Sequence, residues 1–191
     1  MTGMAQAAAR AIEQQAVIPN REQRFRAFVN SHRERAVRLA WRLTGGDAAA
    51  AEDVTQDAFY KAYKVMAQFR EESGLATWYY RILVRQAEKH RRWRAVRERW
   101  SRLWAADVPD PSRNTLPDPG LRRRIAHALN HLPRGQREAF ILVHLEGFTV
   151  SEAAAVLKKS AGTVKSHLHR GLLALRAALA DLHPEGGGSE Q

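Results

Sequence analysis

Apolar positions recur every three or four residues along most of the chain, which is the period of an amphipathic helix. The first such stretch covers 25–43 and ends before a glycine pair at 45–46, which predicts a turn. A second helix is predicted from about Ala48 and a long third one from about Leu75, with a break over 71–74. Because no alternating run of β-branched residues occurs, the chain is predicted to be all-α.

A proline-rich stretch divides the pattern in two. Residues 105–120 read AADVPDPSRNTLPDPG, and proline at this density neither continues a helix nor builds a core, so this segment is predicted to be an acidic, flexible linker. Beyond it, apolar residues over 121–148 predict further helices, divided near Pro133 and Gly135. The chain is therefore expected to form two small helical domains, with this organisation: an N-terminal extension (1–20), a first domain (21–104), the linker (105–120), a second domain (121–180) and a disordered tail (181–191).

The second domain carries a helix-turn-helix pattern. Thr149 stands three residues before Glu152, the spacing of a capping box, so a short helix is predicted from near Val150 to about Leu157. Ser160 is placed to cap a second helix after a short turn. That helix has donors and cations on its outer face, which suit a DNA major groove: Thr163, Lys165, Ser166, His169 and Arg170. A plain helical hairpin with a solvated face is the alternative.

Charge favours a polyanionic partner. The 191 residues include 31 Lys and Arg against 20 Asp and Glu, a net charge of +11, so nucleic acid is the first expectation and a membrane surface the second. The absence of cysteine excludes disulfides, thiolate zinc sites and a cysteine nucleophile. Neither a secretory h-region nor a long apolar run occurs, so we expect no direct membrane insertion and a cytoplasmic protein.

The long third helix combines arginines with aromatic residues. Arg81, Arg85, Lys89 and Arg92 follow at intervals of four, four and three, which places them on one cationic ridge able to track phosphates. Neighbouring tryptophans and tyrosines are suited to stack on unpaired bases, each stack being worth about 1 to 3 kcal/mol. The alternative is that the aromatic residues are core anchors and the arginines only a solubilising face.

The sequence offers little support for a catalytic site. Asp53 and Asp57 share a helix face, but no glycine-rich phosphate loop or partner histidine lies near them in the sequence. His127 and His131 have the spacing of two zinc ligands without the general-base glutamate of a metalloprotease helix. We therefore expect neither an enzyme, nor a cofactor, nor a metal site.

Three blocks in this order carry a family resemblance. They are LTGGDAAAAEDVTQDAFYKAYK, then FREESGLATWYYRILVRQ, and finally the segment from LP at 132–133 to TVKS at 163–166. Together they strongly resemble the extracytoplasmic-function (ECF) sigma factors of bacterial RNA polymerase. The resemblance covers roughly 25–179, and it implies a sigma2-like domain and a sigma4-like domain with no third domain between them.

The resemblance also implies roles for individual residues. A patch that docks on the core polymerase clamp helices corresponds to Asp53, Val54, Gln56, Asp57 and Phe59. Recognition and melting of the minus-ten promoter element corresponds to Arg70, Glu71, Glu72, Ser73, Trp78, Tyr79, Arg81, Arg85, Gln86, Lys89 and Arg92. Reading of the minus-thirty-five element corresponds to Ser160, Thr163, Lys165, Ser166, His167, His169 and Arg170.

The implied partners are bacterial core RNA polymerase, promoter DNA and an anti-sigma factor that covers the polymerase-binding faces. The linker carboxylates would lie in the catalytic and RNA-exit channel of the polymerase. Four positions depart from the family pattern: Gln86 replaces an asparagine, His90 an aspartate, Lys158 a glycine and His167 an arginine. Base preference at both promoter elements is therefore expected to differ from the family's usual one.

Two other functions stay open from the residues alone. One is a stand-alone helix-turn-helix regulator that binds a palindromic duplex as a dimer. The other is a protein-interaction module that is basic only for solubility, whose behaviour on DNA would not depend on salt.

Overall fold

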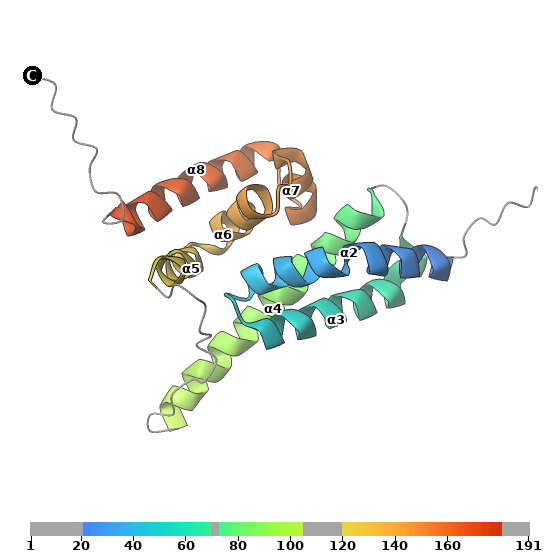
Figure 1. The fold of residues 1–191 in the computed structure, drawn as a ribbon, viewed down its shortest axis with the longest axis horizontal. Coiled ribbons are helices and arrows are strands. Elements are labelled where there is room, and N and C mark those ends of the chain that lie inside the picture. The colour runs from blue at the N-terminus through green and yellow to red at the C-terminus, as the bar shows by residue number, and fades with distance from the viewer. Residues whose placement is uncertain (1–20, 70–72, 105–119, 181–191) are drawn as a thin grey trace, which may run out of the picture. The chain divides into compact units, whose positions relative to one another are not determined.

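The computed structural model describes residues 21–69, 73–104 and 120–180 (Figure 1). By contact the chain divides into two units, Met1–Arg33 and Glu34–Gln191. Every element in the described ranges is helical and none is a strand, so the all-α prediction is confirmed. The expected N-terminal extension, the linker apart from Gly120, and the expected tail lie outside the described residues. No helix of the described ranges is long and apolar enough to cross a membrane.

Helix α2 (Arg21–Leu43) begins in the first unit and ends in the second. Within the first unit Phe25 and Phe28 are buried, and the ring of Phe28 stacks on that of His32 with their centroids 4.1 Å apart. Within the second unit Leu39 and Ala40 are fully buried. The apolar period over 25–43 is thus that of one helix, as predicted.

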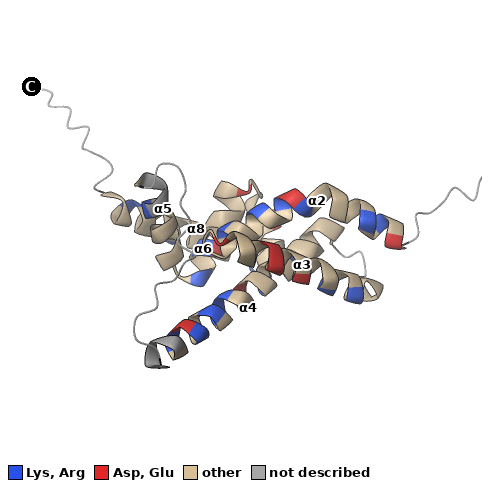
Figure 2. Ribbon diagram, turned by 60° about the horizontal axis from the view of Figure 1, so that its bottom comes forward, with Lys and Arg blue, Asp and Glu red and all other residues tan. Residues whose placement is uncertain are grey.

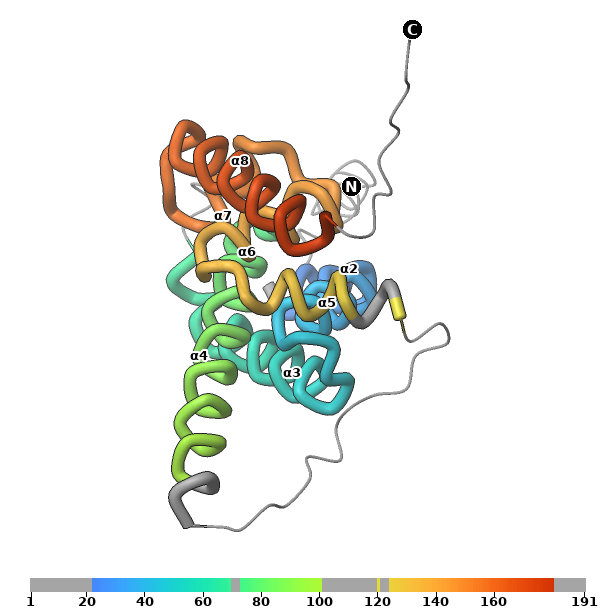
Figure 3. The backbone as a smooth tube through the Cα atoms, turned by 90° about the vertical axis from the view of Figure 1, so that its left-hand side faces the viewer, coloured from blue at the N-terminus to red at the C-terminus, as the bar shows by residue number. Residues whose placement is uncertain are grey.

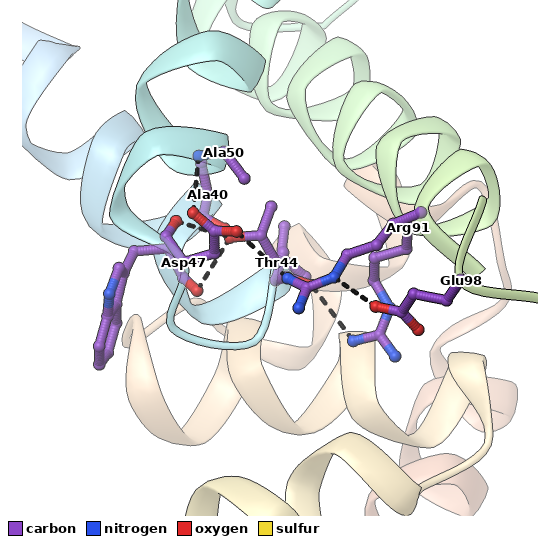
Figure 4. A network of polar contacts seen from close by, with 9 residues as sticks. Ala40, Thr44, Asp47, Ala50, Arg91 and Glu98 are labelled. Carbon is purple, nitrogen blue, oxygen red and sulfur yellow. Dashed lines mark hydrogen bonds and ion pairs between the residues drawn. The ribbon is translucent and has the colours of Figure 1, made fainter. Parts of the chain in front are cut away.

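The predicted turn after α2 is confirmed, and its polar groups are satisfied locally (Figure 4). The hydroxyl of Thr44 donates to the carbonyl of Ala40 at 2.9 Å. Gly45 and Gly46 adopt φ values of 84° and 93°, a left-handed region that residues with a Cβ enter at a cost. The side chain of Asp47 then accepts a hydrogen bond from the backbone N–H of Ala50 at 3.0 Å, which caps the next helix.

Helices α3 (Ala48–Val65) and α4 (Leu75–Trp104) pack side by side, with the short 3-10 turn η1 (Met66–Gln68) after α3. Helix α3 turns a stripe of small residues inward, and α4 faces it with large ones: Val54, Ala58 and Ala62 against Tyr79, Leu83 and Ala87. The rings of Phe59 and Tyr79 stack with centroids 4.4 Å apart. Small residues on one helix leave room for the aromatic side chains of the other, which is why the pair packs closely.

Four helices and one π-helical turn follow in the second half (Figure 3). They are α5 (Leu121–His131), α6 (Arg134–Phe140), the π turn η2 (Ile141–Leu145), α7 (Val150–Leu157) and α8 (Ala161–Ala178). Pro133 stands between α5 and α6, as predicted, because it continues no preceding helix but is well placed just before a new one. Helix α8 packs on both α6 and α7, with Val164 and Leu175 buried.

A buried carboxylate after η2 was not anticipated from the sequence. The side chain of Glu146 is only 1% exposed, and its oxygens face Arg35 at 3.9 Å and Arg38 at 3.7 Å. Arg42 makes an ion pair with the same carboxylate and donates to the carbonyl of Leu145. Because an unpaired polar group is unfavourable inside a protein, these three arginines are the contacts that stabilise the buried Glu146 side chain.

Candidate functional site

The helix-turn-helix has both of its predicted caps. Helix α7 begins after Thr149, whose hydroxyl accepts from the backbone N–H of Glu152 at 3.2 Å, while the Glu152 carboxylate accepts from the backbone N–H of Thr149 at 2.8 Å. These hydrogen bonds lower the pKa of Glu152, because they favour its ionised form. Ser160 caps α8 by accepting from the backbone N–H of Thr163 at 3.0 Å.

The turn between these two helices is strained at one residue. Lys158 adopts φ 53° and ψ 49°, the left-handed conformation that costs a residue with a Cβ roughly 1 to 2 kcal/mol. This is the position at which the family resemblance expects a glycine. The turn therefore keeps its backbone geometry with a lysine in place, at a cost in stability.

Helix α8 presents most of the predicted polar face to solvent. Lys165, Ser166, His169 and Arg170 are exposed, together with Ser160, whereas Thr163 is half-buried. Val164 on the opposite side is fully buried. The first three turns of α8 thus carry a row of exposed cations and donors that are suited to enter a groove.

His167 differs from the exposed residues of this face, because its side chain also contacts a neighbouring helix. Its imidazole packs against Gly135 of α6: a Cβ placed on Gly135 would lie 2.8 Å from Nε2 of His167. Burial, together with the nearby charges of Lys159 and Arg170, lowers the pKa of His167. His167 is thus half-buried and packs between α8 and α6, and its contact with bases stays a prediction.

Helix α4 carries the predicted cationic ridge (Figure 2). Arg85, Lys89 and Arg92 are all exposed, and none of the three has an ion pair among the described residues. Arg81 differs, because the residue is half-buried and its guanidinium donates to the carbonyl of Ala155 in α7 at 3.0 Å. Three of the four ridge cations are thus available to a polyanion, and Arg81 is engaged within the chain.

The aromatic residues at the start of α4 divide between surface and core. Trp78 is half-buried and lies beside Phe69, with ring centroids 5.1 Å apart. Tyr79 is 0% exposed, and burial raises the pKa of its hydroxyl far above the usual value. Tyr79 is therefore a core side chain, so its predicted place along the DNA strand is corrected. Gln86 and Ser73 are half-buried, whereas Arg70, Glu71 and Glu72 lie outside the described residues.

The acidic patch on α3 is on the surface apart from one member. Asp53, Gln56 and Asp57 are exposed and Phe59 is half-buried, so they form one accessible face. Val54 is only 3% exposed and points into the helix pair, which corrects its predicted role as a docking contact. The patch that is available for docking is thus acidic, with the half-buried Phe59 near it on the same helix.

A second charged cluster joins α4 to α6 and went unnoticed in the sequence. Glu88 faces Arg134 at 3.6 Å and Arg137 at 3.9 Å, and Glu138 accepts from Arg134 at 2.8 Å. Burial lowers the pKa of Arg137 to about 10 and raises that of Glu138. The signal available in the sequence was the spacing of Arg134 and Glu138 four residues apart, but Glu88 is too distant in sequence to be paired by inspection.

The described residues do not form the arrangement of side chains that a metal site needs. His127 and His131 stack with their ring centroids 4.1 Å apart, and Nδ1 of His131 lies 2.8 Å from the carbonyl oxygen of His127. In the ranges that the structure describes, no three His, Cys, Asp or Glu side chains gather as a metal site would require.

Comparisons with known proteins agree on one family. The Sigma-70 region 2 family matches residues 28–100, and the Sigma-70, region 4 family matches residues 122–175. The RNA polymerase sigma-H factor of Pseudomonas aeruginosa is 32% identical over 148 residues, which are 71% of this chain and 76% of that protein. The ECF RNA polymerase sigma factor SigK of Mycolicibacterium vanbaalenii is 32% identical over 160 residues, 81% of each chain.

A solved structure gives the same result. The sigma factor RpoE of Bartonella quintana, crystallised with the anti-sigma factor NepR, is similar with a TM-score of 0.63 and 27% identity. The match covers 82% of this chain and 96% of that one. The first half of the chain thus matches a sigma-70 region as clearly as the helix-turn-helix half does, which a stand-alone helix-turn-helix regulator would not explain.

Proposed function

The chain belongs to the extracytoplasmic-function sigma factors of the sigma-70 family, and from this membership we propose that it binds bacterial core RNA polymerase and directs it to specific promoters. It is a transcription initiation factor and not an enzyme, because RNA synthesis is the reaction of the polymerase. One observation carries the proposal most directly. A single chain holds a helix-turn-helix with both of its caps formed and a separate helix with three exposed cations that enter no ion pair within the described residues.

The domain assignment follows the two helical groups. Residues 21–104 form a sigma2-like domain that docks on the polymerase and handles the minus-ten element, and residues 121–180 form a sigma4-like domain for the minus-thirty-five element. The segment 105–120 joins them as an acidic linker. The protein acts in the cytoplasm, where its polymerase and its promoters are.

The exposed acidic face of α3 is the polymerase-docking surface. Asp53, Gln56 and Asp57 suit a basic coiled coil, because opposite charges steer association and fix its register. We expect Asp53→Lys together with Asp57→Lys to abolish co-elution with core polymerase in gel filtration. The pair Asp53→Asn and Asp57→Asn is the matched control for shape, and it should weaken binding without reversing the charge. Unchanged polymerase affinity of the lysine variant, with an intact circular dichroism spectrum, would remove this assignment.

The ridge of α4 handles the minus-ten element. Arg85, Lys89 and Arg92 follow the phosphates of one strand, while Trp78, at the start of the same helix, packs beside an unpaired base. Extruding a base costs a few kcal/mol, which stacking and phosphate contacts offset. We expect Arg85→Ala with Lys89→Ala to lower the slope of log affinity against log salt by about 2, one for each lost phosphate contact.

The outer face of α8 reads the minus-thirty-five element as duplex. Lys165, Ser166, His169 and Arg170 enter the major groove, where each lost base contact is worth roughly 1 to 3 kcal/mol. Arg176→Ala, on an exposed arginine in the last turn of α8, is the matched control and should leave duplex affinity nearly unchanged. If Lys165→Ala with Arg170→Ala weakens binding equally on every sequence, these residues touch phosphates only.

Control by an anti-sigma factor is part of the same proposal. The similar RpoE was crystallised with its anti-sigma factor NepR. A partner of this kind would cover the acidic face of α3 and exposed faces of the second domain. Co-expression with such a partner should therefore prevent co-elution with core polymerase.

A further inference from the structure

The C-terminal part of α4 carries exposed apolar residues that the proposed function does not use. Trp93 is 66% exposed, Val96 47% and Trp100 60%, all of them within the second unit. At about 100° per residue, these three side chains fall within about 60° of arc on the helix surface. Exposed apolar residues gathered on one helix face, rather than scattered, mark an interaction surface.

Their spacing is that of a coiled-coil seam. The steps of three and four residues place Trp93 at a heptad a position, Val96 at d and Trp100 at the next a. The flanking positions, e and g, decide which helix such a seam accepts. In this chain Arg97 occupies e, and Arg92 and Arg99 occupy the two g positions. All three flanking positions therefore carry the same positive charge.

These flanking arginines are not neutralised within the part of the chain that the structure describes. Arg97 and Arg99 are exposed and enter no ion pair among the described residues. Arg94, which lies away from the seam, is by contrast paired with Asp47 at 3.2 Å and with Glu98 at 2.8 Å. Within the described residues, α4 thus has an ion-paired arginine on its packed side, whereas the arginines beside the seam enter no ion pair.

We propose that the seam of α4, formed by Trp93, Val96 and Trp100 between the flanking Arg92, Arg97 and Arg99, docks an acidic amphipathic helix of a partner protein. The apolar positions of that helix would pack between the two tryptophans. Its Glu or Asp side chains would meet the flanking arginines. Tryptophan and arginine are the residues that most often supply the binding energy of such contacts.

The two other occupants fit less well. A second copy of this chain would bring arginine-flanked seams together, and like charges at the e and g positions oppose that pairing. Nucleic acid would contact the arginines through its phosphates and the indole rings through its bases, but it would leave Val96 at the centre of the seam without an apolar partner. An acidic helix uses both the charge and the apolar row.

The test uses the full chain and a defined peptide. A fluorescein-labelled helical peptide of three heptads, with isoleucine at a, leucine at d and glutamate at e and g, is titrated with the protein and followed by anisotropy. A scrambled peptide of identical composition controls for simple attraction to a basic protein. We expect the heptad peptide to bind at least about tenfold more tightly than the scrambled one.

Variants separate the seam from the rest of the helix. Trp93→Ala with Trp100→Ala should abolish the preference for the heptad peptide. Arg97→Glu with Arg99→Glu should transfer the preference to a peptide with lysine at e and g. Ala95→Gln, at an exposed position away from the seam, is the matched control and should change nothing.

Three outcomes would overturn the proposal. They are equal binding of the heptad and scrambled peptides, dimerisation of the free protein that Trp93→Ala with Trp100→Ala removes, and tighter binding of an oligo-dT strand through the same two tryptophans without any peptide preference. None of these depends on promoter activity, so the inference and the proposed function can fail separately.

Discussion

Helices α4 and α8 both present exposed cations, but α4 also uses other arginines to hold its own position. Besides its packing on α3, helix α4 is held by polar contacts: Arg94 pairs with Asp47, and Arg91 donates to the carbonyl of Leu43 at 3.4 Å and to the side chain of Asn130 at 3.2 Å. Burial lowers the pKa of Arg91, although the neighbouring Glu88 and Glu138 oppose this.

Helix α8 is held by close packing and by its cap. Val164 is 0% exposed, His167 lies against Gly135, and a Cβ on Gly171 would lie 3.5 Å from Cβ of Gln136. The comparison teaches that the net charge of a helix does not show which of its arginines are available to bind DNA, because several arginines of α4 make contacts within the protein. It also predicts that removing a charged side chain lowers the free energy of unfolding most at α4, whereas adding side-chain volume lowers it most at α8.

The largest effect is expected at the cap that joins α3 to α4. Asp47→Ala removes both the hydrogen bond to Ala50 and the ion pair with Arg94, so the free energy of unfolding should fall by about 2 kcal/mol. Asp47→Asn keeps the cap and removes only the charge, and it should cost about 0.5 kcal/mol. Urea denaturation of the two variants measures both values. If both variants lose the same free energy of unfolding, the ion pair with Arg94 and not the helix cap stabilises the contact between α3 and α4.

The next effect tests packing on α8 with two glycines that occupy the same place, the second residue of their helices. A Cβ on Gly135 would meet His167, so Gly135→Ala should lower the free energy of unfolding by about 1 kcal/mol. This value is the loss from overpacking after the better helix propensity of alanine has been subtracted. Gly162, whose added Cβ would meet only Oγ of Ser160 at 3.8 Å, is the control. Gly162→Ala should raise the free energy of unfolding by about 0.5 kcal/mol. Thermal denaturation of both variants measures these changes. Equal gains at both sites would mean that His167 is free to move.

The turn of the helix-turn-helix provides a smaller, stabilising effect. Lys158→Gly relieves the left-handed strain, and the free energy of unfolding should rise by about 0.5 kcal/mol after the greater freedom of glycine in the unfolded chain is counted. Lys159→Gly, one residue later, is the matched control and should lower it by a similar amount. A loss in both variants would show that the turn does not strain Lys158.

The smallest effect is a pH dependence at His167. Its folded-state pKa lies below the unfolded value near 6.5, so as pH falls through 6.5 the unfolded chain takes up the proton first and stability is lost. The stability of the wild-type protein relative to His167→Asn should therefore shrink between pH 8 and pH 5. Denaturation at both pH values measures this difference. A constant difference would place His167 in solvent, contrary to its contact with Gly135.

Local signals in the sequence predicted the elements well. The capping box at Thr149 and Glu152 and the cap at Ser160 predicted the bounds of α7 and the start of α8, because caps depend only on neighbouring residues. The glycine pair predicted the end of α2 for the same reason. The π turn at 141–145 has no such local signature and was not predicted.

Long-range contacts explain where the predicted site was wrong. Val54 and Tyr79 lie on helix faces whose direction depends on how α3 and α4 meet, so a motif places them in the right helix but not on the right side. The contact of His167 with Gly135, 32 positions earlier in the chain, likewise has no local signal in the sequence. Glu146 and its three arginines were missed because about a hundred residues separate them in sequence.

Transcription with purified core polymerase tests the central claim most directly. Run-off transcripts are mapped on a pool of genomic fragments with and without the protein, after any bound anti-sigma factor has been removed. We expect start sites that depend on the protein and share two upstream elements, and the Asp53→Lys with Asp57→Lys variant should lose all of them. Start sites that are unchanged by the protein would contradict its role as a sigma factor.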